Sequence, residues 1–136
     1  MPRQTLSKTE RLKSYKRIRL LFAEGEKFRV SPVLVYYRFV TSSSPDAAPS
    51  SLQMGVSVSS RHFKRAVDRN LLKRRIRESY RKQKLALKAS LEEKGLAMDL
   101  FLVYIEPKIF SYQEIDTAIT EAMTKLIRRT ASKMGA

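Results

Sequence analysis

A run of basic residues in the middle of the chain constrains its fold and its partners most strongly. Between Arg61 and Lys84, twenty-four residues include eleven lysines and arginines but only two acids, Asp68 and Glu78. At 100° per residue of an α-helix, seven polar side chains of this run fall within an arc of about 140°. The residues in this arc are Arg69, Asn70, Lys73, Arg74, Arg77, Arg81 and Lys84. At one edge of the arc, and slightly overlapping it, lies an apolar stripe of Leu72, Ile76, Tyr80 and Leu87.

This pattern predicts one long helix, over about residues 64–92, that packs its apolar stripe on a core and presents guanidinium groups to a polyanion. The alternative is a solvated charged face, which normally mixes charges of both signs. Here acids are nearly absent, so i,i+4 ion pairs cannot offset the repulsion among the cations. We therefore interpret the run as a nucleic-acid-binding surface.

The composition supports the same interpretation. The 136 residues carry a net charge of +15, 43% of them are hydrophobic, and none is cysteine. This length and apolar content predict a single domain with its own core. The lack of cysteine excludes disulfides, Cys-based zinc sites and thiol nucleophiles.

The positive excess predicts a polyanionic partner, either nucleic acid or an anionic membrane surface. A membrane-binding helix would place bulky apolar residues opposite its cationic face, whereas the apolar stripe here includes Ser79 and Gln83. No apolar stretch has the length of a secretory signal or a membrane span. We expect a cytoplasmic protein that binds nucleic acid, with no membrane partner and no small-molecule substrate.

The first half of the chain contains a helix and two strand regions. Ser14 is a suitable N-cap for the helix, and Gly25 is a suitable C′ residue. The expected segments are a basic arm 1–13, a helix from Ser14 to Glu24, a strand region 28–40, a Ser/Pro loop 41–51 and a strand 52–59. In the last strand, alternation turns Leu52, Met54, Val56 and Val58 toward a core. A matching register buries Val33, Val35, Tyr37 and Phe39, and leaves Leu34, Tyr36 and Arg38 on an open face.

In the second half, Gly95 marks the end of the long helix, and residues 98–105 form an apolar strand before Pro107. Ser111 and Glu114 form a capping box for a final helix to about residue 129, followed by a tail 130–136. The order predicts one α+β domain over 14–129. We expect a two-layer domain with a mostly antiparallel sheet of about four strands and three helices, the helices lying on one side of the sheet.

The residues do not favour a protein active site. The single histidine, His62, lies in a basic turn and is expected to be exposed. Three further carboxylates, those of Asp99, Glu106 and Asp116, are scattered, so no metal cluster and no catalytic residue is predicted. If the protein takes part in a reaction, a partner must supply the reactive centre.

Two aromatic residues indicate which kind of nucleic acid is bound. Phe22 in the first helix and Tyr36 on the open sheet face are placed to form a platform for unstacked bases. Each ring can instead belong to the core, and for Phe22 this is the commoner arrangement. Arg38 beside Tyr36 favours single-stranded nucleic acid on this face.

The sequence also resembles that of a known protein family. The pattern Lys64-x-Ala66-Val67-x-Arg69-Asn70-x-x-Lys73-Arg74-x-x-Arg77-Glu78-x-x-Arg81 closely resembles the RNR signature of the protein subunit of bacterial ribonuclease P. Further similarity lies in Arg11-Leu12 with Phe22 and Gly25, in residues 55–59 and in residues 99–103. The resemblance covers about residues 11–127.

The resemblance implies that a large catalytic RNA, with Mg²⁺ held mainly by that RNA, removes the 5′ leader of precursor tRNA. The protein alone is then not catalytic: it stabilises the RNA fold and holds the leader between the sheet and the first helix. The resemblance also implies a left-handed βαβ crossover around the basic helix. The residues implied to bind the catalytic RNA are Arg61, Lys64, Arg65, Arg69, Asn70, Lys73, Arg74, Arg77 and Arg81. Those implied to line the leader cleft are Ile18, Phe22, Tyr36, Arg38 and Ser57.

The chain departs from the family pattern at two places. Ile18 occupies a position that is often phenylalanine, and residues 60–65 replace a shorter turn of the Lys-Lys-x-Gly type. A ribosomal-type structural RNA-binding protein without a role in cleavage is the alternative. A DNA-binding helix-turn-helix protein fits less well, because no short helix pair precedes a recognition helix.

Overall fold

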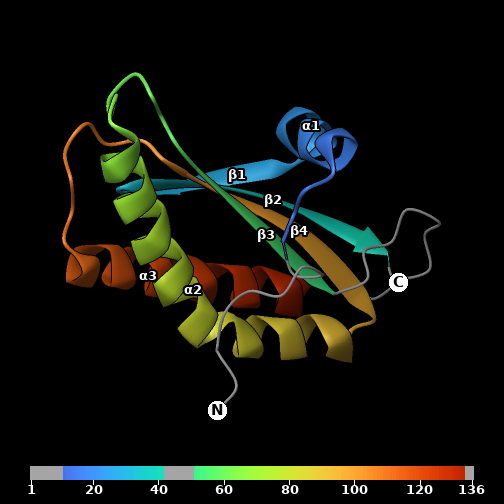
Figure 1. The fold of residues 1–136 in the computed structure, drawn as a ribbon. Coiled ribbons are helices and arrows are strands. Elements are labelled where there is room, and N and C mark those ends of the chain that lie inside the picture. The colour runs from blue at the N-terminus through green and yellow to red at the C-terminus, as the bar shows by residue number, and fades with distance from the viewer. Residues whose placement is uncertain (1–10, 42–50, 134–136) are drawn as a thin grey trace, which may run out of the picture.

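The structure, a computed structural model, describes residues 11–41 and 51–133. These residues form three helices and four strands in one domain (Figure 1). Residues 1–10 of the predicted arm, most of the predicted loop 41–51 and residues 134–136 lie outside the described ranges. In chain order the elements are α1 (Tyr15–Glu24), β1 (Glu26–Val30), β2 (Val33–Thr41), β3 (Leu52–Val58), α2 (Ala66–Glu93), β4 (Leu96–Tyr104) and α3 (Tyr112–Ser132).

The four strands form one mixed sheet in the order β1-β2-β4-β3. β2 pairs antiparallel with both β1 and β4, whereas β3 and β4 are parallel and are connected through α2. The prediction of an α+β domain with a mostly antiparallel sheet of about four strands and three helices is therefore confirmed. The parallel pair with α2 between its strands is the βαβ unit that the family resemblance implies.

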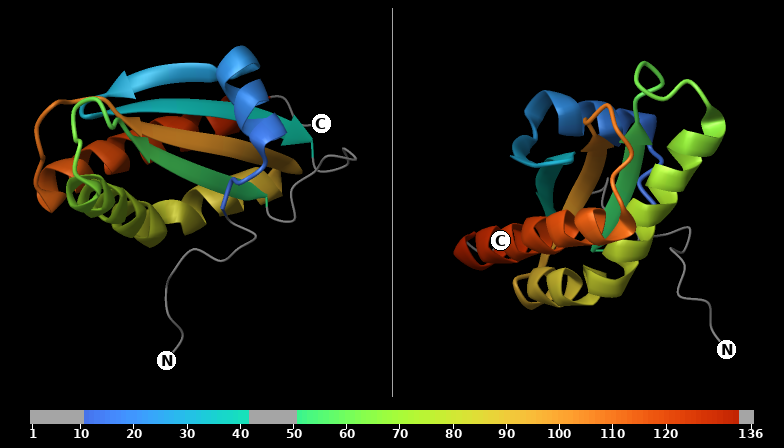
Figure 2. Two further views of the ribbon diagram at one scale, coloured as in Figure 1. Left: turned by 45° about the horizontal axis from the view of Figure 1, so that its top comes forward. Right: turned by 90° about the vertical axis from the view of Figure 1, so that its left-hand side faces the viewer.

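The helices lie on both faces of this sheet. α2 and α3 pack together on one face, whereas α1 crosses the other face over β2 and β4 (Figures 1 and 2). The expectation that all helices share one side is therefore wrong for α1. Its amphipathic pattern predicts a helix but carries no information about which face of the sheet it covers.

The strand region predicted over residues 28–40 consists of two strands. β1 and β2 form a hairpin whose turn contains Ser31 and Pro32, joined by a cis peptide bond. Proline lacks the N–H that a strand ladder needs, so it lies between the strands and not within one. The predicted register of β2 is confirmed, because Val33, Val35 and Tyr37 are buried and Phe39 packs against the core.

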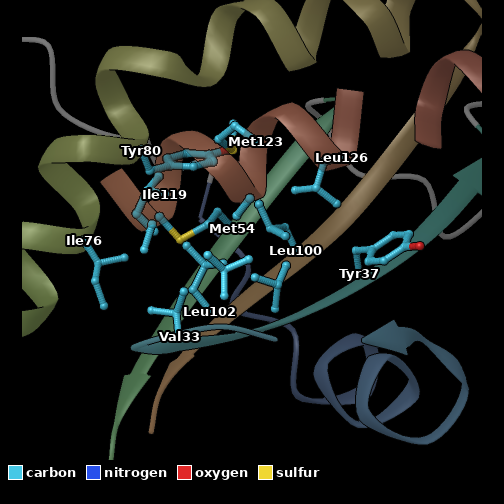
Figure 3. Close-up of a cluster of buried hydrophobic side chains, with 14 of the residues drawn as sticks. Val33, Tyr37, Met54, Ile76, Tyr80, Leu100, Leu102, Ile119, Met123 and Leu126 are labelled. Atoms are coloured by element: carbon cyan, nitrogen blue, oxygen red, sulfur yellow. The ribbon is translucent and has the colours of Figure 1, made fainter. Parts of the chain in front are cut away.

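The core lies between the sheet and the pair α2–α3 (Figure 3). From α2 it receives the predicted stripe of Leu72, Ile76, Tyr80 and Leu87, each at most 1% exposed. From α3 it receives Ile115, Ile119, Met123 and Leu126. Each such burial stabilises the fold by about 1.5–3 kcal/mol. The packing of this stripe determines the rotation of α2, and therefore which of its residues face outward.

The helix ends largely follow the predicted signals. α2 is followed by Gly95 at φ +67°, a left-handed conformation that glycine adopts without strain. α3 begins with the predicted capping box but continues to Ser132, so the predicted tail from 130 starts too early. Thr130 is buried there, and its hydroxyl donates to the carbonyl of Leu126 at 2.8 Å.

The last residues of the predicted arm attach to the edge of the sheet. Arg11 forms an isolated parallel bridge with Met54 of β3, and the backbone N–H of Leu12 donates to the Met54 carbonyl at 3.0 Å. The Leu12 side chain is only 5% exposed. Residues 11 and 12 thus cover part of the β3 edge, which would otherwise present unpaired backbone groups.

Candidate RNA interface

Seven polar residues of α2 lie on the side of the helix that the core leaves uncovered, and we call them the α2 basic surface. Asn70, Arg74 and Arg77 are exposed, and the other four are half-buried. The arrangement follows from the buried stripe, since residues outside that stripe must face solvent or the helix flanks. The surface consists of Arg69, Asn70, Lys73, Arg74, Arg77, Arg81 and Lys84.

Not every cation of the α2 basic surface has an acidic partner. Arg81 forms an ion pair with Glu78. A surface pair of this kind contributes little to stability. Lys73, Arg74 and Arg77 are not ion-paired with any described carboxylate. Cations in this state favour an external polyanion.

Arg69 differs from the rest of the surface, because its guanidinium is used inside the fold. Its Nη1 donates to the carbonyl oxygens of Phe63 at 2.7 Å and of Lys64 at 2.8 Å. These bonds hold the turn that leads into α2. The sequence interpretation, which treats Arg69 as an RNA contact like its neighbours, has no signal for this inward use.

The turn before α2 carries three further cations. Arg61, Lys64 and Arg65 are all exposed, and Arg65 is the N-cap residue of the helix. Phe63 anchors the turn: it is buried, and its ring lies 5.9 Å from that of Tyr104. The three cations therefore surround the positive end of the α2 dipole, which strengthens the attraction for anions there.

A buried ion pair attaches α1 to the open face of the sheet. Nε of Arg17 donates to Oδ2 of Asp99 at 3.1 Å, and a second guanidinium nitrogen contacts Oδ1. Nη1 of Arg17 also donates to Oε1 of Gln53 at 2.8 Å. Asp99 is 0% exposed, and Gln53, expected on an open polar face, is 6% exposed because α1 covers it.

The charge balance beneath α1 depends on this contact. Burial raises the pKa of the Asp99 carboxyl above its ordinary value, while the guanidinium of Arg17 and the charge of Arg38 oppose that rise. Arg38 lies directly across from Asp99 in the β2–β4 register. We conclude that Arg17 and Asp99 form one unit that positions α1 on the sheet.

Beside this ion pair, three aromatic rings form a contiguous group on the open face, which we call the aromatic strip. The ring of Phe22 lies 4.6 Å from that of Tyr36 and 5.2 Å from that of Phe101, in edge-to-face geometry. Phe22 is 43% exposed, so it is not a core residue. Aromatic rings exposed together on a sheet can stack on unpaired bases.

Phe101 is a residue of this strip that the sequence interpretation missed. It lies at the centre of the sheet, between Tyr36 on one side and Gly55 on the other. A Cβ atom at Gly55 would be 2.6 Å from the Phe101 ring, so glycine is required for the ring to occupy this position. Every residue of β4 from Leu100 to Val103 is apolar, and this conceals that Phe101 faces away from the core.

The remaining predicted cleft residues do not all lie with the strip. Ile18 is half-buried one helical turn before Phe22, and Ser57 is half-buried in β3, two residues beyond Gly55 on the same face. Arg38 instead lines a separate hollow of about 820 Å³ between the end of α1 and the end of α3. Ile18, Phe22, Tyr36 and Ser57 do not line this hollow.

His62 is exposed in the turn before α2, as predicted. Within residues 11–41 and 51–133, no three histidine or acidic side chains come close enough to hold a metal ion. In the same ranges no helix is both long enough and apolar enough to span a bilayer.

Comparisons with known proteins show which proteins this chain is similar to. The family model described as Ribonuclease P matches residues 6–130. A relative from Porphyromonas gingivalis, "Ribonuclease P protein component", is 35% identical over 121 residues, which are 89% of this chain and 85% of the relative. A relative of the same description from Picosynechococcus is 36% identical over 76 residues, covering 56% of this chain and 60% of its own length.

Solved structures have the same fold. The RNase P protein of Staphylococcus aureus superposes with a TM-score of 0.64 at 22% identity, covering 93% of this chain and 98% of that structure. The protein from Thermotoga maritima gives a TM-score of 0.63 at 19% identity, with coverages of 85% and 96%. At these identities the structural likeness shows the fold.

Proposed function

Because this chain belongs to the ribonuclease P protein family, it is the protein subunit of an endoribonuclease that matures the 5′ end of tRNA, and we propose that its two surfaces divide that work. The α2 basic surface binds the catalytic RNA, and the aromatic strip binds the 5′ leader of the precursor. The observation that carries this division is the contrast between Lys73, Arg74 and Arg77, which are not ion-paired with any described carboxylate, and the grouped aromatic rings beside α1. The ribosomal-type alternative has no support in the family match.

Binding of the catalytic RNA fits the charge and position of α2. Lys73, Arg74 and Arg77 face outward without ion-paired carboxylates, and Arg61, Lys64 and Arg65 extend the positive surface around the helix N-terminus. Arg and Lys contacts to phosphates release counterions, so we expect affinity to fall steeply with salt. Arg69 contributes mainly by holding the turn that presents these cations.

Leader binding fits the aromatic strip. Single-stranded RNA exposes base faces that a duplex hides, and stacking on aromatic rings recognises them without a strict sequence requirement. Phe22, Tyr36 and Phe101 provide such faces, with Ile18 and Ser57 at the border. Arg38 is not part of this proposal, because it lies directly across from Asp99 and lines the hollow between the ends of α1 and α3.

Chemistry at the phosphodiester is assigned to the RNA. We infer that Mg²⁺ is held mainly by the catalytic RNA, since the described carboxylates are dispersed over the protein and one of them, Asp99, is engaged by Arg17. The protein contributes binding, orientation and charge neutralisation. A cytoplasmic location is proposed from this function, because catalytic RNA and precursor tRNA are both present there.

Reconstitution tests the proposed function. Adding the protein to the catalytic RNA at low magnesium concentration should restore cleavage of precursor tRNA at the 5′ end of the mature sequence. The protein alone should cleave nothing under the same conditions. A chain that binds the RNA without restoring cleavage would have the structural role of the alternative.

A further inference from the structure

A third cationic group lies between the two surfaces of the proposed function. The arm, β3 and α2 enclose a cavity of about 240 Å³, lined among others by Arg11, Lys13, Gly55, Arg77 and Phe101. Phe101 is shared with the aromatic strip, and Arg77 belongs to the α2 basic surface. The cavity therefore connects the two surfaces.

Different parts of the fold bring the three cations together. Pairing of Arg11 with Met54 attaches the arm beside β3, and burial of Leu12 turns its two neighbours outward, since successive side chains of an extended segment point to opposite sides. Arg11 and Lys13 are both exposed. Arg77 reaches the same cavity from α2, whose rotation the core determines. The convergence is thus built into the fold.

The cations at this cavity repel one another. Loss of hydration and the nearby charge of Arg11 both lower the pKa of Arg77 below its ordinary value. None of the described acidic residues lines the cavity, and neither arginine is ion-paired with a described carboxylate. An anion bound between them would remove this repulsion and gain charge-assisted hydrogen bonds.

We propose that Arg11, Lys13 and Arg77 bind one phosphodiester of RNA, at the point where the strand passes between the α2 basic surface and the aromatic strip. This inference rests on the proposed function, which supplies RNA as the polyanion. Gly55 supports it indirectly, because the absence of a side chain there lets the Phe101 ring lie beside the cavity. Phe101 in the same lining gives an adjacent base or sugar an aromatic surface to contact.

The phosphodiester can belong to the leader or to the catalytic RNA, and replacement of single linkages distinguishes them. In the first experiment, each leader linkage of the precursor is replaced in turn by an uncharged methylphosphonate. One replacement should weaken precursor binding by the wild-type holoenzyme roughly tenfold, as for the loss of one charge-assisted contact. That penalty should disappear in the Arg11→Gln holoenzyme, whose binding is already reduced.

In the second experiment, the affinity of the protein for the catalytic RNA is measured without precursor. If the phosphodiester belongs to that RNA, Arg11→Gln and Lys13→Gln each weaken assembly roughly tenfold and leader replacements have no effect. Lys16→Gln is the matched control, because Lys16 is exposed on α1 and does not line the cavity. Circular dichroism verifies folding of Arg11→Gln, in which the backbone bond of Leu12 is retained.

The inference is overturned if the Arg11→Gln and Lys13→Gln variants bind precursor and catalytic RNA as the Lys16→Gln variant does in both experiments, while the wild-type protein restores leader cleavage. Failure of the proposed function looks different, because the wild-type protein itself would then fail to restore cleavage. Arg11→Lys provides a further check, since it keeps the charge and should recover part of the lost affinity.

Discussion

Arg17 of α1 has the opposite environment to Arg74 and Arg77 of α2. Arg17 is covered by the fold and bonded to Asp99 and Gln53, so its charge is fully used within the protein. Arg74 and Arg77 are exposed and are not ion-paired with any described carboxylate. The first arrangement fixes a helix to a sheet, and the second leaves charge available for RNA.

This contrast shows that the count of basic residues does not measure an RNA-binding surface. What matters is whether each cation already has a carboxylate or carbonyl partner. Arg69 differs in this respect from other residues of the same helix, because it lies in the cationic arc but donates to two carbonyl oxygens of the preceding turn. Four experiments test the distinction.

The largest effect is expected for Arg17→Met. It leaves the fully buried Asp99 carboxylate with only Arg38 nearby, so the free energy of unfolding should fall by roughly 3 kcal/mol, the lower end for breaking a buried pair. Denaturant unfolding measures this, and Arg19→Met on the exposed side of α1 should change stability by less than about 0.5 kcal/mol. Equal losses in the two variants would mean that the pair does not hold α1.

The next effect is expected on RNA affinity, for Lys73→Gln combined with Arg74→Gln. Losing two charge-assisted contacts should weaken binding of the catalytic RNA roughly 100-fold, with little change in stability. The slope of log affinity against log salt should become shallower by about one for each contact. The control combines Lys16→Gln with Arg128→Gln, two exposed positions outside the α2 basic surface. A slope unchanged from the wild type would contradict the assignment.

A smaller and more selective effect is expected for Phe22→Ala. Removing one stacking ring should weaken binding of precursor tRNA by about 1–2 kcal/mol, and binding of mature tRNA should be unchanged because it lacks the leader. Leu85→Ala removes another exposed apolar side chain, 70% exposed on α2, and serves as the control. Equal losses on precursor and mature tRNA would indicate that Phe22 has a structural role.

The smallest effect is expected for Arg69→Gln. Arg69 lies in the cationic arc of α2, like Arg74, but its guanidinium is bonded within the fold, like that of Arg17. Loss of its bonds to two carbonyl oxygens should reduce the free energy of unfolding by about 1 kcal/mol. The salt slope of RNA binding should stay at the wild-type value, unlike that of Arg74→Gln. A shallower slope with unchanged stability would place Arg69 among the RNA contacts.

Features that depend on local periodicity could be predicted from the sequence. The rotation of α2, its buried stripe and the capping box of α3 all follow from residues within a few turns of one another. The register of β2 follows from alternation in the same way. For these elements the information lies in neighbouring residues, and no distant partner changes the outcome.

Features that depend on distant partners could not be predicted. α1 lies on the opposite face of the sheet because Arg17 meets Asp99, 82 residues later in the chain. The β1–β2 hairpin was missed because its turn is short and interrupts a nearly continuous run of strand-forming residues. Phe101 could not be placed because the run from Leu100 to Val103 is apolar on both faces, so alternation within it does not reveal the direction of the ring.

The position of Asp99 in the central strand β4 has a consequence for biosynthesis. α2 is formed largely by local contacts, whereas the Asp99 partner of Arg17 emerges from the ribosome only with the strand at residues 96–104. Phe101 belongs to the same strand, so the proposed platform for the leader is completed only after β4 has emerged. A nascent chain would then present the proposed RNA-binding helix before the proposed leader platform is complete.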